Sequence, residues 1–520
     1  MTISKENTTG RVCLIGAGPG DEGLITVQGL RMLRLADVVV YDMLANPRLL
    51  NEVRPDAEHV PVGMRGESDK LSQDQINALL IDRAKQGYFV VRLKGGDPYL
   101  FGRGAEEVAA VTRSGIGCQV VPGVTSGIAA PMAAGIPVSR RDVASTVTFV
   151  TGHEDPTKGQ MQVDYRALAG LIQAGGTVCF FMAVGRWQEI TDALSGYGAV
   201  AQTPVAVVER GFTPLQRCIR SDLAKATKAM KQANLKSPAI MVVGPVAAIS
   251  EPGLEFYIRR PLFTQRVVIT RTRHQASKLY DMLSEFGAHV LEAPTIEFKP
   301  PEDWGQIDKA ITHLDQFDWL VLTSVNGVEA LAKRLGFLSL DARDLAGVKI
   351  AAIGDATESE LRARLGIQAD LVPPHYVAES LGQQLIDGGF VKDRKFLLLR
   401  ADIARPKLHQ MLNEAGGQVK DLAIYETKRA QRLPEDVLAA LRRKEVDWVT
   451  FTSSSTAINM AEMLGGERDL IQDLNIASIG PITSQTVRDL GWTINVEADP
   501  SNLRGLVAAI VQASHANTKC

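Results

Sequence analysis

Glycine, proline and aspartate residues follow a short apolar segment near the start of the sequence, in "RVCLIGAGPGDEG". Gly18, Gly20 and Gly23 have the spacing G-x-G-x-x-G, and Asp42 ends the next apolar segment, "ADVVVYD". A strand, a glycine loop, a helix and a later acid are typical of a dinucleotide site, where backbone N–H groups bind the pyrophosphate. One interpretation is therefore an NAD-dependent oxidoreductase that uses this loop.

Two residues of the same loop argue against a phosphate ligand. Pro19 has no backbone N–H to donate, and the carboxylate of Asp21 would repel a phosphate group. S-Adenosylmethionine contains no phosphate, and its positively charged sulfonium tolerates nearby carboxylates. The loop by itself leaves both ligands open, a nicotinamide dinucleotide and S-adenosylmethionine.

Two further glycine loops follow apolar segments in the first half of the chain. Gly95, Gly96 and Asp97 come directly after "VVRLK", and the loop in "VVPGVTSG" contains Thr125 and Ser126. Glycines let the backbone approach a ligand closely. Aspartate can accept a hydrogen bond from an amino group, and hydroxyls can bind a carboxylate. These groups suit the methionine part of S-adenosylmethionine, although glycines also form tight turns without any ligand.

These candidate residues need a scaffold that brings strand ends together. Short apolar segments such as "STVTFVTG" and "GTVCFFMAVG" alternate with helical patterns, which indicates an α/β fold with largely parallel sheets. In such sheets, ligands bind at the carboxyl ends of the strands. The chain has 520 residues, 45% of them hydrophobic, which is enough for several cores. A stretch rich in proline, glycine and arginine separates two predicted domains, residues 10–255 and 264–515.

The first domain resembles the tetrapyrrole (corrin/porphyrin) methyltransferases, and most closely the uroporphyrinogen-III C-methyltransferases. The matching segments keep the family order: "GAGPGD", "ADVVVYDMLANP", "VVRLKGGDPYLFGRGAEE", "VVPGVTSG", "AGIPVSRRD", "VTFVTGH" and "TPVAVVERG". The resemblance implies a two-lobed module, usually a homodimer, that binds S-adenosylmethionine between its lobes. It also implies methylation of uroporphyrinogen III at C2 and C7, which gives precorrin-2 for sirohaem or cobalamin.

The resemblance also implies roles for individual residues. Asp42 takes the place of the family's proton acceptor, although an aspartate there can also cap the turn after the strand. Met64 replaces the family's proton-donating lysine and cannot transfer a proton. Arg65 and Arg140 still supply positive charge for an acidic substrate. The expected cofactor contacts are Pro19, Gly95, Gly96, Asp97, Leu100, Thr125, Ser126, Met182 and Gly211.

The second half of the sequence contains an internal repeat. "FDWLVLTSVNGVEAL" recurs as "VDWVTFTSSSTAINM", so that Trp319 and Trp448 are 129 positions apart, as are Gly287 and Gly416. This period is too long for a solenoid of small stacked repeats. Two similar α/β lobes are expected, with a cleft between them for a ligand.

Hydroxyl groups recur in this repeat, where no known catalytic motif is recognisable. They come directly after apolar segments that predict strands, and basic residues accompany them. Hydroxyls and backbone N–H groups at helix N-termini suit a ligand with several carboxylates. Instead of binding a ligand, each hydroxyl can simply cap the helix that follows it. The predicted substrate-binding residues of this half are Arg271, Thr323, Ser324, Arg400, Thr452 and Ser453.

The repeat resembles the uroporphyrinogen-III synthases through "TSVNGVEAL", "AIGDATESEL", "AIYET", "FTSSSTA" and "IGPITSQTV". The resemblance implies two flavodoxin-like lobes, lobe one from residues 266–295 and 428–515 and lobe two from residues 296–427. It implies closure of hydroxymethylbilane to uroporphyrinogen III with inversion of ring D and without a cofactor. Tyr425 and Thr483 take the places of the family's cleft tyrosine and threonine, and the phenol of Tyr425 can assist loss of the hydroxyl group.

The two resemblances together imply one bifunctional enzyme of tetrapyrrole biosynthesis, because one half would make the substrate of the other. The alternative for the second half is a tetrapyrrole-binding unit without catalysis. A net charge of −2 gives no reason to expect a nucleic acid partner, and five scattered cysteines predict a reducing cytoplasm and no metal site. The polar first residues predict no signal peptide, and the lack of an apolar stretch of about 18 residues predicts no membrane partner.

Overall fold

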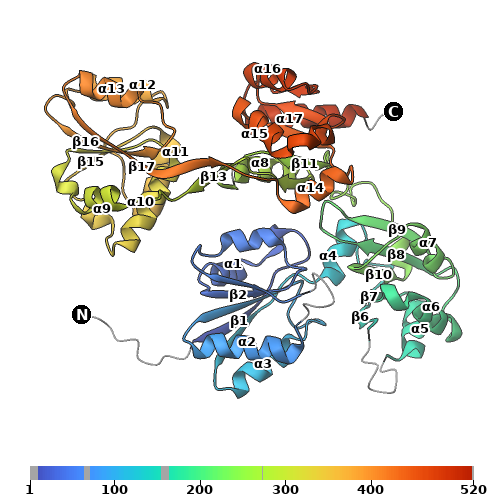
Figure 1. Cartoon of the computed structure of the whole chain (residues 1–520). Coiled ribbons are helices and arrows are strands. Elements are labelled where there is room, and N and C mark those ends of the chain that lie inside the picture. The colour runs from blue at the N-terminus through green and yellow to red at the C-terminus, as the bar shows by residue number, and fades with distance from the viewer. Residues whose placement is uncertain (1–9, 64–70, 154–162, 272, 518–520) are drawn as a thin grey trace. The chain divides into compact units, whose positions relative to one another are not determined.

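The computed structural model describes residues 10–63, 71–153, 163–271 and 273–517. The chain forms two compact units, one mainly from residues up to Arg266 and the other mainly from residues 267–510. The strands form four five-stranded sheets with helices beside them (Figure 1). The α/β class predicted from the alternating pattern is confirmed.

The first sheet is entirely parallel and has the strand order β3-β2-β4-β1-β5. Its central strands are buried on both faces, which explains why "VCLI" and "VVV" are apolar without alternation. The strands are β1 (Arg11–Gly16), β2 (Val38–Tyr41), β3 (Glu58–Pro61), β4 (Phe89–Lys94) and β5 (Gly117–Val121). The accompanying helices are η1 (Glu22–Leu24), α1 (Val27–Leu33), η2 (Pro47–Glu52), α2 (Gln73–Lys85) and α3 (Gly104–Arg113).

The second sheet is mixed, with the order β6-β7-β10-β8-β9, and only β6 and β7 run parallel. The expectation of a parallel sheet is wrong here. The link between β8 and β9 (residues 210–216) is too short for a parallel crossover, which needs about a dozen residues. The strands are β6 (Val147–Thr151), β7 (Thr177–Phe181), β8 (Pro204–Glu209), β9 (Arg217–Asp222) and β10 (Ala239–Val243). The helices are α4 (Ser126–Ala133), α5 (Tyr165–Gln173), η5 (Val184–Arg186), α6 (Trp187–Gly196), α7 (Ala226–Gln232) and η6 (Pro245–Ala248).

The third sheet has the order β12-β11-β18-β19-β20, which is the flavodoxin-like order 2-1-3-4-5 counted along the chain. The strands are β11 (Arg266–Ile269), β12 (His289–Glu292), β18 (Trp448–Phe451), β19 (Asn475–Ser478) and β20 (Val496–Glu497). The helices that accompany this sheet along the chain are α8 (Arg273–Glu285), α14 (Glu435–Arg442), α15 (Ser454–Leu464), η9 (Gly465–Ile471), α16 (Pro481–Asp489) and α17 (Leu503–Asn517).

The fourth sheet has the order β13-β17-β16-β14-β15, with β13 antiparallel to the end of β17 and the other neighbours parallel. The strands are β13 (Ile296–Lys299), β14 (Trp319–Leu322), β15 (Lys349–Ala352), β16 (Lys395–Ala401) and β17 (Gln418–Arg429). The helices are α9 (Gly305–Thr312), η7 (Leu314–Gln316), α10 (Val325–Phe337), η8 (Ala342–Leu345), α11 (Asp355–Leu365), α12 (Ala378–Asp387) and α13 (Lys407–Glu414).

The two copies of the sequence repeat exchange strands between the third and fourth sheets. β11 and β12 come from the first copy, but β11 pairs with β18 of the second copy. β16 and β17 come from the second copy, and β16 pairs with β14 of the first. Each sheet is therefore built from parts of both copies, and the unit that repeats in the sequence is not the unit that forms a sheet.

Three glycines make close backbone contacts where the first sheet ends. Gly16 ends β1, Gly96 follows β4, and Gly123 follows β5. A Cβ atom on Gly123 would lie 2.2 Å from the carbonyl oxygen of Gly96 and 2.6 Å from the Cα of Gly16. Because both contacts are to backbone atoms, no side chain can move aside. The three loops can pack only without side chains between them.

We expect Gly123→Ala to destabilise the first unit by about 2 kcal/mol, because an added methyl group forces the loops apart. Differential scanning calorimetry of the whole chain would measure this as a lower transition temperature for that unit. Gly117→Ala in β5 is the matched control, since a Cβ there meets no atom within 4 Å. Its transition should shift by less than about 0.5 kcal/mol. Equal shifts in the two variants would contradict the packing argument.

Candidate active sites

Two backbone hydrogen bonds join the glycine loops that follow β1 and β4. The Gly96 N–H donates to the Gly18 carbonyl at 3.0 Å, and the Gly18 N–H donates to the Gly96 carbonyl at 3.3 Å. Both glycines have a left-handed φ, 75° and 68°, which glycine adopts without strain. A Cβ atom at Gly96 would meet only the Ser126 nitrogen, at 3.9 Å. The space beside Gly96 and Ser126 is therefore open, at the carboxyl edge of the first sheet.

Asp97 ties the second and third glycine loops together. Its Oδ1 accepts hydrogen bonds from the backbone N–H groups of Tyr99 at 2.8 Å and Leu100 at 3.2 Å. Its Oδ2 accepts a hydrogen bond from the Gly123 N–H at 3.0 Å. The carboxylate thus fixes the loop backbone, in addition to the cofactor contact that the sequence predicts for it.

The other predicted cofactor residues lie on elements of both sheets of the first unit. Thr125 is the N-cap of α4 and accepts a hydrogen bond from the Gly127 N–H at 3.3 Å. Met182 follows β7, has a left-handed φ of 54° and is exposed. Gly211 lies near the end of β8, where a Cβ atom would collide with Ala130 of α4. Of the remaining members, Pro19 is buried, and Gly95 and Leu100 are half-buried.

The strand order contradicts the dinucleotide interpretation. In a dinucleotide-binding fold, the acid ends the strand beside the one that carries the glycine loop. Here β4 lies between β1 and β2, so Asp42 ends a strand about 9–10 Å from β1. The helix α1 also begins only at Val27, capped by Thr26, rather than inside the glycine loop. The NAD-dependent oxidoreductase interpretation is therefore wrong.

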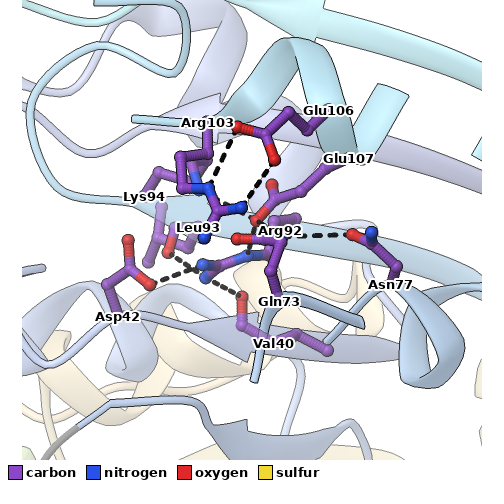
Figure 2. A network of polar contacts seen from close by, with 10 residues as sticks. All are labelled: Val40, Asp42, Gln73, Asn77, Arg92, Leu93, Lys94, Arg103, Glu106 and Glu107. Atoms are coloured by element: carbon purple, nitrogen blue, oxygen red, sulfur yellow. Dashed lines mark hydrogen bonds and ion pairs between the residues drawn. The ribbon is translucent and has the colours of Figure 1, made fainter. Parts of the chain in front are cut away.

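Asp42 belongs to a network of charged side chains in the first sheet (Figure 2). The Nη2 of Arg92 lies 2.5 Å from the Oδ1 of Asp42, and its Nε lies 3.3 Å from the Oε1 of Glu107. The Nζ of Lys94 lies 3.0 Å from the same Glu107 oxygen. The side chains of Arg92, Lys94 and Glu107 are 3%, 5% and 0% exposed, whereas that of Asp42 is 28% exposed. The network therefore runs from the interior of the module to its surface at Asp42.

Two cations and two carboxylates face one another in this network. Burial lowers the pKa of Lys94 and the neighbouring Arg92 lowers it further, whereas Glu107 and Asp42 raise it. The Nε2 of Gln73 also donates to the Oε1 of Glu107, at 3.2 Å. A buried charge without a partner is strongly destabilising. We infer that Glu107 is the group that allows both cations to be buried.

Sequence reasoning identified Asp42 but missed Arg92, Lys94 and Glu107. A signal was present in "FVVRLK", where two charged residues two positions apart share one face of an otherwise apolar strand. Charged residues are rarely buried unless they are paired. The pattern therefore predicts carboxylate partners, but their identity depends on how β2 and α3 pack against β4.

Tyr425 of β17 is buried, and its hydroxyl lies 3.0 Å from the Oγ of Ser324. Ser324 is the N-cap of α10 and accepts a hydrogen bond from the Gly327 N–H at 3.0 Å. Burial raises the pKa of Tyr425, so its phenol stays protonated at neutral pH. The fourth sheet thus places a hydroxyl donor at a helix N-terminus, where an anionic group is favoured.

Thr483 lies in the first turn of α16, after the third sheet, and is buried. Its neighbour Ser484 lies 2.5 Å from the Oγ of Ser478 and also donates a hydrogen bond to Glu497. Tyr425 lies in β17 of the fourth sheet and Thr483 follows β19 of the third sheet, so neither sheet by itself contains both predicted catalytic residues.

Two of the recurring hydroxyls are helix caps at equivalent positions of the repeat. Ser324 caps α10, and Ser453 caps α15 by accepting a hydrogen bond from the Thr456 N–H at 3.3 Å. The preceding residues, Thr323 and Thr452, are half-buried. Capping is therefore a role of both serines, and substrate contact stays a prediction for these hydroxyls.

The buried Arg400 is held inside the fourth-sheet lobe. Its guanidinium donates to both carboxylate oxygens of Asp421, with the Nε contact at 2.7 Å, and to the Arg405 carbonyl at 2.7 Å. These charge-assisted hydrogen bonds hold the Arg400 guanidinium in one position. If Arg400 binds the substrate, as the sequence predicts, its guanidinium must contact the substrate while it also contacts Asp421 and the Arg405 carbonyl.

Two other predicted substrate cations, Arg140 and Arg271, are more accessible than Arg400. Arg140 is exposed and pairs with Glu251 at 2.5 Å. Arg271 is half-buried, and burial lowers the pKa of its guanidinium. Arg65, like Met64, lies outside the described residues.

Comparison with known proteins identifies both halves of the chain. The family model of the tetrapyrrole (corrin/porphyrin) methylases matches residues 11–227, and that of uroporphyrinogen-III synthase HemD matches residues 277–508. A porphyrin biosynthesis protein HemD of Ruminiclostridium josui is 30% identical over 509 residues, 98% of this chain and 99% of that protein. The chain belongs to the tetrapyrrole methylases and the uroporphyrinogen-III synthases.

The tetrapyrrole methylase module has further relatives. An S-adenosyl-L-methionine-dependent uroporphyrinogen III methyltransferase of Methanosarcina barkeri is 43% identical over 242 residues, 46% of this chain and 94% of that protein. A Thermus thermophilus uroporphyrin-III C-methyl transferase, solved in complex with S-adenyl homocysteine, is 38% identical. That match covers 46% of this chain and 98% of the other, with a TM-score of 0.39. With both families in one chain, the protein is a bifunctional enzyme of tetrapyrrole biosynthesis.

Neither a membrane-spanning segment nor a metal cluster is found in the part of the chain that the structure describes. None of its helices is long and apolar enough to cross a membrane. In the same part of the chain, no three His, Cys, Asp or Glu side chains are grouped so that they could hold a metal ion.

We expect Glu107→Gln to destabilise the methylase module by about 3 kcal/mol, because it leaves Arg92 and Lys94 buried with a single carboxylate. Calorimetry of the whole chain should show the methylase transition about 6–12 °C lower, with the synthase transition unchanged. Glu58→Gln is the matched control, since Glu58 pairs with Arg83 at the surface, and it should change stability by less than about 1 kcal/mol. A Glu107→Gln transition as high as that of the control would contradict the inference.

Proposed function

We propose that the methylase module methylates uroporphyrinogen III at C2 and C7 with S-adenosylmethionine, giving precorrin-2. The synthase module closes hydroxymethylbilane to uroporphyrinogen III with inversion of ring D, and thereby supplies the substrate of the first reaction. Membership of both families supports this pair of reactions. The observation that carries the methyl transfer is Asp42, a partly exposed carboxylate at the same edge of the sheet as the glycine loops.

The residues around the glycine loops fit S-adenosylmethionine. The open space beside Gly96 and Ser126 admits a ligand, and the cap position of Thr125 offers a hydroxyl and backbone N–H groups for a carboxylate. Pro19, which has no N–H to donate, and the carboxylate of Asp21 make the first loop unsuited to a phosphate. When bound there, S-adenosylmethionine supplies an electrophilic methyl group. The methylases related to this chain include one named as S-adenosyl-L-methionine-dependent.

Asp42 accepts a proton in the proposed mechanism. Addition of a methyl group to a pyrrole carbon leaves the substrate with a positive charge, which is removed when a proton departs. A carboxylate that faces the substrate can take this proton. The partial exposure of Asp42 allows it to reach the substrate, and its contact with Arg92 holds it in place. In this chain, Met64 cannot take the part of the family's lysine, so Asp42 is the proton-transferring group proposed for this step.

We expect Asp42→Asn to reduce methylation about 100-fold or more, because the amide cannot accept the proton. The measurement is precorrin-2 formation from uroporphyrinogen III and labelled S-adenosylmethionine. The same preparation should keep its affinity for S-adenosylmethionine, which shows that the methylase module is folded, and should close hydroxymethylbilane at the normal rate. Asp56→Asn, an exposed aspartate of the same sheet region, is the matched control. Unchanged methylation in Asp42→Asn would refute the role of Asp42.

The synthase module acts mainly by holding a reactive substrate in the right geometry. Loss of water from hydroxymethylbilane, as hydroxide from the hydroxymethyl carbon and a proton from the pyrrole nitrogen, gives an azafulvene. Ring closure then depends on how the linear tetrapyrrole is folded. Tyr425 is protonated and lies at the N-terminus of α10, so it can donate a hydrogen bond to the departing oxygen. The proposed carboxylate contacts are Arg271, Thr323, Ser324, Arg400, Thr452 and Ser453, with Thr483 in the cleft. No cofactor is proposed for this module.

We expect Tyr425→Phe to reduce formation of uroporphyrinogen III about 100-fold, because the leaving oxygen loses its donor. Chromatographic separation of the type I and type III isomers measures this, since the type I isomer forms without the enzyme. The fraction of type III should fall, while methylation of added uroporphyrinogen III stays normal. An unchanged isomer ratio and rate would exclude Tyr425 from the reaction.

We also propose the setting in which the enzyme works. The four described cysteines are free, and burial raises the pKa of Cys13 and Cys118 to about 11 and that of Cys179 to about 12. Protonated, unpaired thiols support a reducing cytoplasm. A homodimer formed through the methylase module and the absence of nucleic acid partners are further parts of the proposal. They rest on the family resemblance and on the net charge of −2.

A further inference from the structure

The guanidinium of Arg92 is fixed on three sides (Figure 2). Its Nη2 donates to Asp42 at 2.5 Å, and its Nε donates to Glu107 at 3.3 Å. Its Nη1 donates to the carbonyls of Val40 at 3.4 Å and Leu93 at 3.3 Å. Val40 lies in β2, and Asp42 comes directly after this strand. The guanidinium therefore holds the strand end and the carboxylate that follows it as one unit.

This contact restricts how the Asp42 carboxylate can turn. One oxygen lies on the guanidinium, and Figure 2 shows the other pointing away from it. A side chain held at one oxygen and by its own strand loses most of its rotational freedom. Asp42 thus has one occupied oxygen and one directed elsewhere, which is the arrangement that a fixed proton acceptor requires.

Arg92 and Lys94 are not equivalent, although both are buried cations on β4. Lys94 contacts Glu107, with its Nζ at 3.0 Å from Oε1. Arg92 contacts Glu107 and Asp42 at once, because a guanidinium presents donors in a rigid planar fork. Both cations share Glu107, and Asp42 supplies the second carboxylate, which Arg92 contacts directly. The contact between Arg92 and Asp42 therefore balances buried charge and at the same time fixes the position of Asp42.

We propose that Arg92 is a positioning residue for methyl transfer, which acts through Asp42 by fixing the carboxylate that accepts the substrate proton. This inference rests on the role proposed for Asp42. A reacting group displaced by about 1 Å can lose about 100-fold in rate. The loss should appear in kcat, because Arg92 lies behind Asp42 and its buried guanidinium does not line the open space beside the glycine loops.

The test compares Arg92→Gln in two backgrounds, the unchanged chain and the Asp42→Asn variant. In the unchanged chain we expect kcat for methylation to fall about 100-fold. The Kd for S-adenosylmethionine and the KM for uroporphyrinogen III should stay within about twofold, since the residues proposed to bind them are intact. In the Asp42→Asn background, Arg92→Gln should change the residual kcat by less than about twofold, because effects of residues that act as a unit are not additive.

Two controls keep the outcome interpretable. Arg34→Gln removes an arginine that pairs with Glu52 at the surface, and it should leave kcat unchanged. The Kd for S-adenosylmethionine and calorimetry of the methylase transition, measured on the same preparations, report on folding of the methylase module. If Arg92→Gln does not fold, Arg92→Lys replaces it, because lysine keeps the buried charge but cannot hold Asp42 and both carbonyls together. We expect this variant also to lose kcat, and to lose it only when Asp42 is present.

The outcomes separate this inference from the proposed function. Full methylation activity in Asp42→Asn would refute the proton acceptor itself. A large loss in Asp42→Asn with an equal further loss on adding Arg92→Gln would keep Asp42 and overturn the positioning role. An unchanged kcat in Arg92→Gln, or a loss confined to KM, would overturn it as well.

Discussion

Two cations on a central strand of the first sheet can be buried only because carboxylates from two other elements face them. Arg92 and Lys94 project from β4, Asp42 follows β2, and Glu107 comes from α3. A misplaced strand or helix would leave a charge without a partner in the interior, which is strongly destabilising. The network therefore specifies the relative positions of β2, β4 and α3. It also places the one partly exposed member, Asp42, at the edge where the glycine loops lie.

The glycine loops add a second constraint at the same edge. Backbone atoms of the loops after β1, β4 and β5 touch directly, and Asp97 binds two of these loops through their N–H groups. Close backbone contact makes this edge rigid without side chains, and leaves open space beside Gly96. The glycine loops and Asp42 thus lie at the same edge of the sheet, which suits a small ligand next to a fixed carboxylate.

The synthase module reaches its fold by a different route. Its two sheets each take strands from both copies of the repeat, as β11 with β18 and β16 with β14. The equivalent serines 129 positions apart, Ser324 and Ser453, cap equivalent helices, α10 and α15. Their capping role agrees with local helix physics. The copies differ at residues without an equivalent side chain, such as Tyr425, which contacts Ser324.

The sequence by itself determined the α/β class, the repeat, both families and the candidate residues, because glycine loops, apolar strands and ordered motifs are local features. It also contained the charges of Arg92 and Lys94, but only the tertiary structure gave them partners. Strand order decided that β4 lies between β1 and β2, which excludes a dinucleotide site and brings Arg92 to Asp42. The tertiary structure also decided that the two repeat copies exchange strands. The strand order of the first sheet and this exchange both depend on pairings between residues far apart in the chain, and no local pattern encodes which strands become neighbours.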